Sequence, residues 1–164
     1  MKHYIITAFF LLAPILVSAD EELKGKVIWV TDGDTIGVLI EGKKKVTVRL
    51  NGIDAPEIGQ DYSAKAKQDL SKRIHEKQVT VKVSGKDKHG RSIGDVFLNK
   101  EDINLWLVAN GYAWHYKRFS KDVTLANAEV KAQDAKIGLW SMTKPMAPWD
   151  YRRKKWEESE RLKK

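Results

Sequence analysis

Residues 24–51, KGKVIWVTDGDTIGVLIEGKKKVTVRLN, decide the fold, because three short segments with a strand-like pattern follow one another along the chain. Apolar and polar residues alternate over 24–30, 35–40 and 46–50, as in strands with one buried face. The two connections contain Asp-Gly-Asp and Glu-Gly-Lys, which are turn sequences. The segment is therefore predicted to form a three-strand meander. Its expected inward-facing residues include Val27, Ile36, Val38, Ile40, Val46, Val48 and Leu50.

Outward from this meander, the pattern adds helices and two more strands. Ala66, Leu70 and Ile74 lie four residues apart and form one apolar stripe. Ser63 and Asp61 are both candidates for the cap of that helix. The predicted elements after the meander are a helix at 62–76, strands at 78–83 and 91–98, and helices at 102–110 and 123–135. Five short strands with an intervening helix suit an α+β fold, a five-stranded closed barrel of the OB type with three helices.

The two ends of the chain differ from this domain. An apolar run at 4–17, ending in Val17-Ser18-Ala19, has the composition of a signal peptide with its cleavage site, and an uncleaved anchor is the alternative. We expect residues 1–19 to be removed, with export to the medium or periplasm and no stable membrane association afterwards. Residues 20–143 are then the folded domain. Residues 144–164 are a basic, tryptophan-containing extension, interpreted as flexible or as a nucleic-acid-binding segment.

Composition narrows the class of partner. The chain has no cysteine, which excludes disulfides and cysteine zinc sites. Its net charge is +8, and loss of residues 1–19 would remove only Lys2 and leave +7. A basic domain favours polyanions, either nucleic acid or an anionic membrane surface. A secreted cationic protein acting on membranes would have an amphipathic cationic helix as its main feature, and no such helix dominates here. A monomer is expected.

Five charged residues lie at strand ends and in adjoining loops: Asp34, Arg49, Asp54, Glu57 and Arg91. Each one alone has an ordinary interpretation, as a turn residue or an exposed charge. Together they suit phosphate chemistry. Two aspartates with a backbone carbonyl make a minimal site for a hard cation such as calcium, a glutamate beside it can take a proton from water, and two guanidinium groups can bind phosphate oxygens bidentately.

Several short sequence blocks, separated along the chain, resemble those of one known family. The strings DGDT at 32–35, RLNGIDAPE at 49–57 and DKHGR at 87–91 resemble the thermonuclease family, whose best-known member is staphylococcal nuclease. Residues 104–111 and 138–140 resemble it as well. The match spans about 24–140 with the blocks in the family's order.

The resemblance implies a staphylococcal nuclease-like OB barrel with three helices and a role for each matched residue. Asp34, Asp54 and the carbonyl of Ala55 would hold one calcium ion. Arg49 and Arg91 would bind phosphate. It also implies an endonuclease that hydrolyses DNA and RNA at the bond from phosphorus to the 5′ oxygen, leaving 3′-phosphates.

Glu57 matches the residue assigned as general base. Lys88 and His89 match the substrate-contacting loop, where the family often has tyrosine in place of His89. The nucleotide-stacking tyrosine is best matched by Tyr116, with His115 and Tyr112 as alternatives. A second class remains, an OB module that binds nucleic acid without cleaving it. Such a module should lack one or more of the five charged residues, and all five are present.

Overall fold

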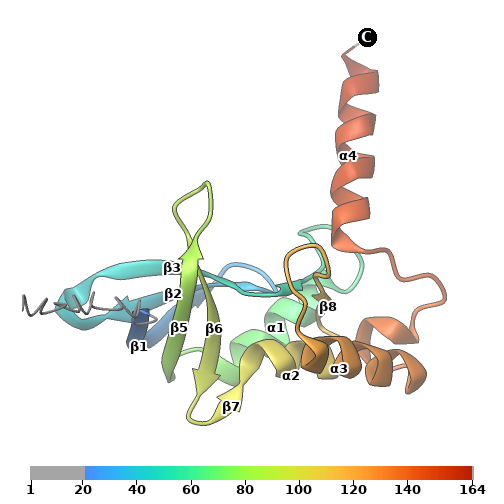
Figure 1. The fold of residues 1–164 in the computed structure, drawn as a ribbon. Helices are drawn as coiled ribbons and strands as arrows, with labels where there is room; N and C mark the ends of the chain where they lie inside the picture. The colour runs from blue at the N-terminus through green and yellow to red at the C-terminus, as the bar shows by residue number, and fades with distance from the viewer. Residues whose placement is uncertain (1–20, 164) are drawn as a thin grey trace, which may run out of the picture.

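A computed structural model of the chain describes residues 21–163. Five strands form a barrel (Figure 1), and the predicted α+β class and OB-type architecture are confirmed. The barrel strands are β1 (Glu21–Val30), β2 (Thr35–Ile40), β3 (Lys45–Leu50), β5 (Gln78–Lys86) and β6 (Ser92–Leu98). They pair in the order β3-β2-β1-β5-β6, and a parallel pairing of β3 with β6 closes the ring. Strands β1 and β5 are longer than the sequence pattern predicted.

The interior of the barrel is filled by the inward-facing alternate residues of the meander. Val27 and Val38 are paired across β1 and β2, and both are completely buried. Ile36, Val48 and Leu50 are buried to the same degree, within one per cent of full burial. Period-two alternation therefore predicted the inner face correctly for the strand centres.

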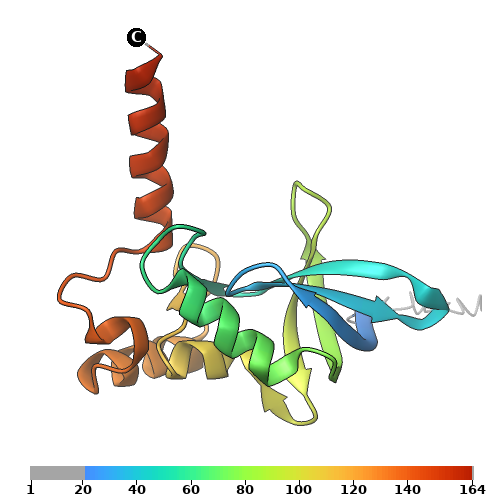
Figure 2. The same ribbon diagram turned by 180° about the vertical axis from the view of Figure 1, so that it is seen from behind.

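Helices cover one side of the barrel (Figures 1 and 2). They are α1 (Ser63–Ile74), α2 (Ile103–Ala109) and α3 (Val123–Asp134). The predicted stripe of Ala66, Leu70 and Ile74 is completely buried against the barrel. Short elements connect these parts: η1 (Glu41–Lys43), β4 (Ile53–Asp54), β7 (Glu101–Asp102), β8 (Trp114–His115) and η2 (Gly138–Ser141).

The ends of the helices follow ordinary capping rules with one exception. Asp102 and Asp122 accept hydrogen bonds from backbone amides in the first turns of α2 and α3. Helix α1 instead starts after Tyr62, whose φ is 71°, and no side chain caps it. Neither Ser63 nor Asp61 therefore acts as the predicted cap.

The C-terminal extension contains a helix that the sequence did not predict. The extension at 144–164 was predicted to be flexible or loosely packed; the structure adds that Pro148–Leu162 form helix α4, in which Pro148 alone is buried. Pro148 occupies the first turn, where its missing amide hydrogen costs nothing. Arg153 pairs with Asp150 three residues earlier, and Lys163 pairs with Glu160. Such a helix needs no apolar stripe, because most of it does not pack against a core.

The predicted signal peptide at 1–19 lies outside the described residues. Within 21–163, the structure has no helix that combines the length and the apolar character needed to cross a membrane.

Candidate active site

The pairing of β2 with β3 brings the first two candidate residues to one rim of the barrel. Asp34 precedes β2 directly, and its neighbour Thr35 is the register partner of Arg49 near the end of β3. The backbone carbonyl of Asp34 accepts a hydrogen bond from the amide of Leu50 at 2.9 Å. The chain then turns through Gly52 into β4, which carries Asp54 back towards the same rim.

Arg49 joins the two aspartates. Its Nη1 donates to Asp34 Oδ1, and its Nη2 donates to Asp54 Oδ1 at 2.6 Å. The backbone amide of Ala55 donates to Asp34 Oδ2, also at 2.6 Å. Asp34, Arg49, Asp54 and Ala55 are thus brought together as the sequence predicted, and we call these four residues the rim cluster.

Burial makes this cluster electrostatically unusual. Asp34 is 1% exposed and Asp54 is 0% exposed. Burial raises the pKa of Asp34 to about 8, although Arg49 and the Ala55 amide act in the opposite direction. Burial also works against the charge of Arg49, but the two carboxylates outweigh it and raise its pKa. Arg49 therefore does not fully offset the cost of burying the charge of Asp34.

The cluster fits a calcium ion of low protein coordination. Hard oxygen donors are present in two adjacent carboxylates, and the poorly supported charge of Asp34 favours an added cation. In the part of the chain that the structure describes, no group of three or more acidic or histidine side chains is gathered as a metal site. Two carboxylates and the Ala55 backbone would therefore leave the remaining positions to water and to phosphate.

Glu57 is linked to this cluster through a residue that sequence reasoning did not place. Arg152, on the first turns of α4, donates through Nη1 to Glu57 Oε1 and through Nη2 to Asp54 Oδ2, the latter at 2.8 Å. Burial opposes the charge of Arg152, but its hydrogen bonds to Asp54 and Glu57 raise its pKa further above its usual range. The sequence shows that the extension at 144–164 is basic, but no sequence signal pairs it with a loop about a hundred residues earlier.

Arg91 lies apart from the other predicted site residues. It precedes β6, whose Ile93 is the register partner of Arg49, so it reaches the same side of the barrel. Its Nε donates to Asp87 Oδ2 at 2.7 Å. Burial raises the pKa of Asp87, but its hydrogen bonds with Arg91 lower it by more, so the pKa lies below its usual value.

A basic cleft of about 300 Å³ adjoins Arg91. Its lining includes four cationic residues, Lys44, Lys45, Lys86 and Arg91, together with His89 and one acid, Glu21. Lys88 and His89 are exposed in the loop between β5 and β6, where the His89 amide donates to Asp87. The cleft therefore presents positive charge beside one of the two predicted phosphate-binding arginines.

The structure distinguishes the three aromatic candidates for a base-stacking residue. His115 is 3% exposed, and Tyr112 packs against Trp106. Tyr116 is joined to the segment before Asp54, since its amide donates to the Gly52 carbonyl at 2.8 Å. Its ring is stacked on Trp149 of α4, with 5.3 Å between centroids and 3° between planes.

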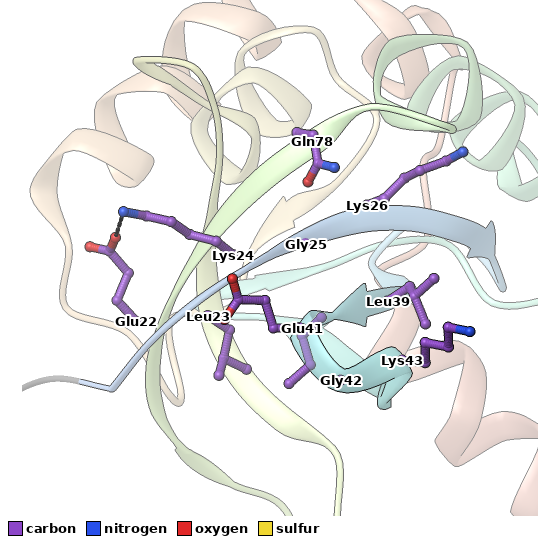
Figure 3. A pocket seen from close by; sticks show the side chains of 11 residues that line it. Glu22, Leu23, Lys24, Gly25, Lys26, Leu39, Glu41, Gly42, Lys43 and Gln78 are labelled. Carbon is purple, nitrogen blue, oxygen red and sulfur yellow. Dashed lines mark ion pairs between the residues drawn. The ribbon is translucent and has the colours of Figure 1, made fainter.

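A larger cleft of about 800 Å³ lies elsewhere, between β1 and the β2–β3 connection (Figure 3). It is lined by an ion pair of Glu22 with Lys24 and by other residues of β1 and β5 such as Gly25 and Gln78. None of the predicted site residues lines it. The charged rim is therefore the better candidate for chemistry.

A five-stranded barrel of the OB type, with two buried carboxylates and an arginine at its rim and a basic cleft at Arg91, has the features expected of a protein that binds nucleic acid. The sequence profile of the family described as staphylococcal nuclease homologue matches residues 47–142. The chain belongs to this family.

Several of its relatives carry nuclease names. A protein of Haemophilus influenzae named an uncharacterized endonuclease is 36% identical over 153 residues, covering 93% of this chain and 86% of that protein. An Escherichia coli protein with the same name is 35% identical over 156 residues, covering 94% of this chain and all of that protein. A probable staphylococcal-like nuclease of Oryza sativa subsp. japonica is 38% identical over 112 residues, but this chain covers only 34% of it.

Proposed function

We propose that this chain is an exported endonuclease that uses one calcium ion to hydrolyse phosphodiester bonds in DNA and RNA, leaving 3′-phosphate and 5′-hydroxyl ends. The coarser statement, that it is a nuclease, follows from the family. The observation that carries the finer proposal is the bridge from Arg49 to both Asp34 and Asp54, because it gathers two buried acids and a phosphate-binding group at one point.

In this proposal Asp34, Asp54 and the backbone of Ala55 hold the calcium ion, which supplies Lewis-acid stabilisation of charge on a phosphate oxygen when bound. Arg49 and Arg91 hydrogen-bond the remaining phosphate oxygens and stabilise the charge that builds up there in the transition state. Arg91 must exchange its bond with Asp87 for one to the phosphate, and Arg49 must likewise exchange one of its bonds with Asp34 and Asp54.

Glu57 is proposed to take a proton from the attacking water. The oxygen of that water forms a bond to phosphorus while the bond from phosphorus to the 5′ oxygen breaks. The departing oxygen takes up a proton from solvent. No step needs a 2′-hydroxyl, so both sugars are accepted.

The substrate strand is proposed to extend from the rim into the basic cleft. Lys88, His89 and Lys45 would meet backbone phosphates, and Tyr116 would stack on a base. A nucleic-acid-binding module without catalysis is the second candidate, and one observation favours it: Arg152 covers the carboxylates of Asp54 and Glu57 that catalysis needs.

Digestion of single-stranded DNA and RNA separates the two candidates. The purified chain is incubated with calcium and, in parallel, with a chelator, and product ends are analysed by labelling before and after phosphatase treatment. Calcium-dependent cleavage with 3′-phosphate ends supports the proposal. Retained binding without cleavage under any divalent cation would assign the chain to the binding class.

A further inference from the structure

The first turns of α4 occupy positions that the proposed reaction requires to be open. Arg152 places one guanidinium on both carboxylate oxygens of Asp54, at 3.1 and 2.8 Å, and on the carboxylate of Glu57. A divalent cation bound by Asp54 would need oxygens that Arg152 holds. Arg152 also holds Oε1 of Glu57, one of the two oxygens that could take a proton from water.

Trp149, one helical turn before Arg152, occupies the second position. Its ring lies parallel to Tyr116, the candidate base-stacking residue, and meets the edge of Trp114 at 5.6 Å between centroids. Trp114 is the register partner of Asp54 in the pairing of β8 with β4. A nucleobase stacking on this face of Tyr116 would have to displace an indole ring of similar size and shape.

The remainder of α4 is not held down. Pro148 is its only buried residue, and Figures 1 and 2 show the helix standing away from the barrel and the other helices. A short tether holds its start in place, because Gln60 donates to the carbonyl of Met146 at 2.6 Å and accepts from the amide of Glu57. Release of Trp149 and Arg152 would therefore leave α4 beside the site and expose little core.

We propose that the first turns of α4 are an inhibitory latch, in which Arg152 stands in the place of the metal on Asp54 and Glu57 while Trp149 stands in the place of a base on Tyr116. The inference rests on the proposed function, since it assigns a competitor to its metal and its substrate. Binding of calcium and of nucleic acid then requires the latch to open, and the apparent affinity for each is reduced by the fraction of time that it is closed.

Arg152 is the arginine that can leave. Arg49 also contacts Asp54, but it extends from a strand that is paired on both sides at this residue, and its side chain is 19% exposed. Arg152 is 39% exposed and belongs to a helix with one buried residue. A bound cation would replace the charge that Arg152 gives to Asp54, so opening leaves no buried carboxylate without a partner.

Calcium titration without nucleic acid tests the latch by isothermal titration calorimetry on four full-length proteins. Arg152→Gln removes the competitor, and Trp149→Ala weakens the latch without changing any charge near the metal. Arg153→Gln is the matched control, because Arg153 is the next residue, pairs only with Asp150 and has the same charge. We expect calcium affinity to rise roughly tenfold in Arg152→Gln and severalfold in Trp149→Ala, as for a latch closed about nine-tenths of the time, and to stay unchanged in Arg153→Gln.

Trp149→Ala, which changes no charge, decides between a latch and a simple charge effect. If Trp149→Ala binds calcium with the wild-type affinity, Arg152 acts only as a local charge and the latch is overturned. The latch is also overturned if Arg152→Gln binds calcium more weakly than the wild type does. If none of the four proteins binds calcium, the metal part of the proposed function fails instead, and the claim that Arg152 stands in a metal's place fails with it. Amide exchange of 148–162 gives a second readout, since calcium should accelerate it in the wild type and not in Arg152→Gln.

Discussion

Asp54 receives guanidinium groups from two different parts of the molecule. Arg49 comes from strand β3 of the closed barrel and also reaches Asp34. Arg152 comes from helix α4 and also reaches Glu57. Both pairs have ion-pair geometry at the same buried carboxylate. They differ in what stands behind the arginine, which is a hydrogen-bonded sheet for Arg49 and a projecting helix for Arg152.

This difference separates a permanent part of the site from an exchangeable one. The backbone that carries Arg49 cannot move without opening the pairing of β2, β3 and β6. The backbone that carries Arg152 can move after the loss of the two aromatic contacts of Trp149 and of the ion pairs themselves. We therefore expect substitutions on the barrel side to affect catalysis and folding, and substitutions on α4 to affect occupancy of the site.

The largest effect is expected for Glu57→Gln, on the barrel side. An amide keeps the shape of the side chain but cannot take a proton, so kcat should fall about 10²–10⁴-fold. Folding and calcium binding should be retained, as measured by thermal melting and calorimetry. Glu157→Gln is the control, because it makes the same change at an exposed position of α4 and should leave turnover unaltered. Normal turnover in Glu57→Gln would remove Glu57 from the mechanism.

Stability measurements compare the two arginines directly. Arg49→Gln leaves two buried carboxylates with too little positive charge and should cost about 3–5 kcal/mol of unfolding free energy at neutral pH. Arg152→Gln removes ion pairs in which the arginine is 39% exposed and screened by solvent, so it should cost less than about 1 kcal/mol. Urea denaturation in the presence of a chelator measures both values. Equal costs would mean that α4 is as much a part of the folded unit as β3.

The same contrast explains which features the sequence could predict. The strands, the inward residues such as Val38 and Leu50, and the stripe of α1 follow from periodicity, because each buries a face in a fixed register. The gathering of Asp34, Arg49 and Asp54 follows from strand adjacency in a meander. Position-by-position roles came from family resemblance and remain predictions.

Features of the C-terminal part could not be predicted in this way. Helix α4 buries almost nothing, so it leaves no apolar stripe in the sequence. The contact of Arg152 with Glu57 depends on how the segment at 142–147 turns, which no periodic pattern records. The absence of a side-chain cap on α1 is similar, because Tyr62 adopts a left-handed conformation that candidate caps in the sequence do not reveal.

Core truncation gives a further comparison between barrel and helix. Leu50 is 1% exposed inside the barrel, and Leu50→Ala should destabilise the protein by about 2–5 kcal/mol. Trp156 is a larger side chain, but it is 64% exposed on α4, and Trp156→Ala should change stability by less than about 0.5 kcal/mol. Thermal melting of both variants checks the prediction. A large loss of stability in Trp156→Ala would contradict the exposed position of Trp156 and would mean that α4 packs against another surface.

The smallest effect tests where the nucleic acid lies. Lys45 lines the cleft beside Arg91, whereas Lys154 is exposed on α4 beyond the latch. If phosphates follow the cleft, Lys45→Gln should weaken binding of single-stranded DNA modestly and lower the slope of log affinity against log salt by about one, while Lys154→Gln should leave the slope unchanged. Fluorescence anisotropy at several salt concentrations, with calcium and in a Glu57→Gln background to prevent cleavage, measures both slopes. A change in the slope reports counterions that are released where the substituted lysine meets a phosphate. If Lys154→Gln lowers the slope and Lys45→Gln does not, the nucleic acid leaves the site along α4 and not along the cleft.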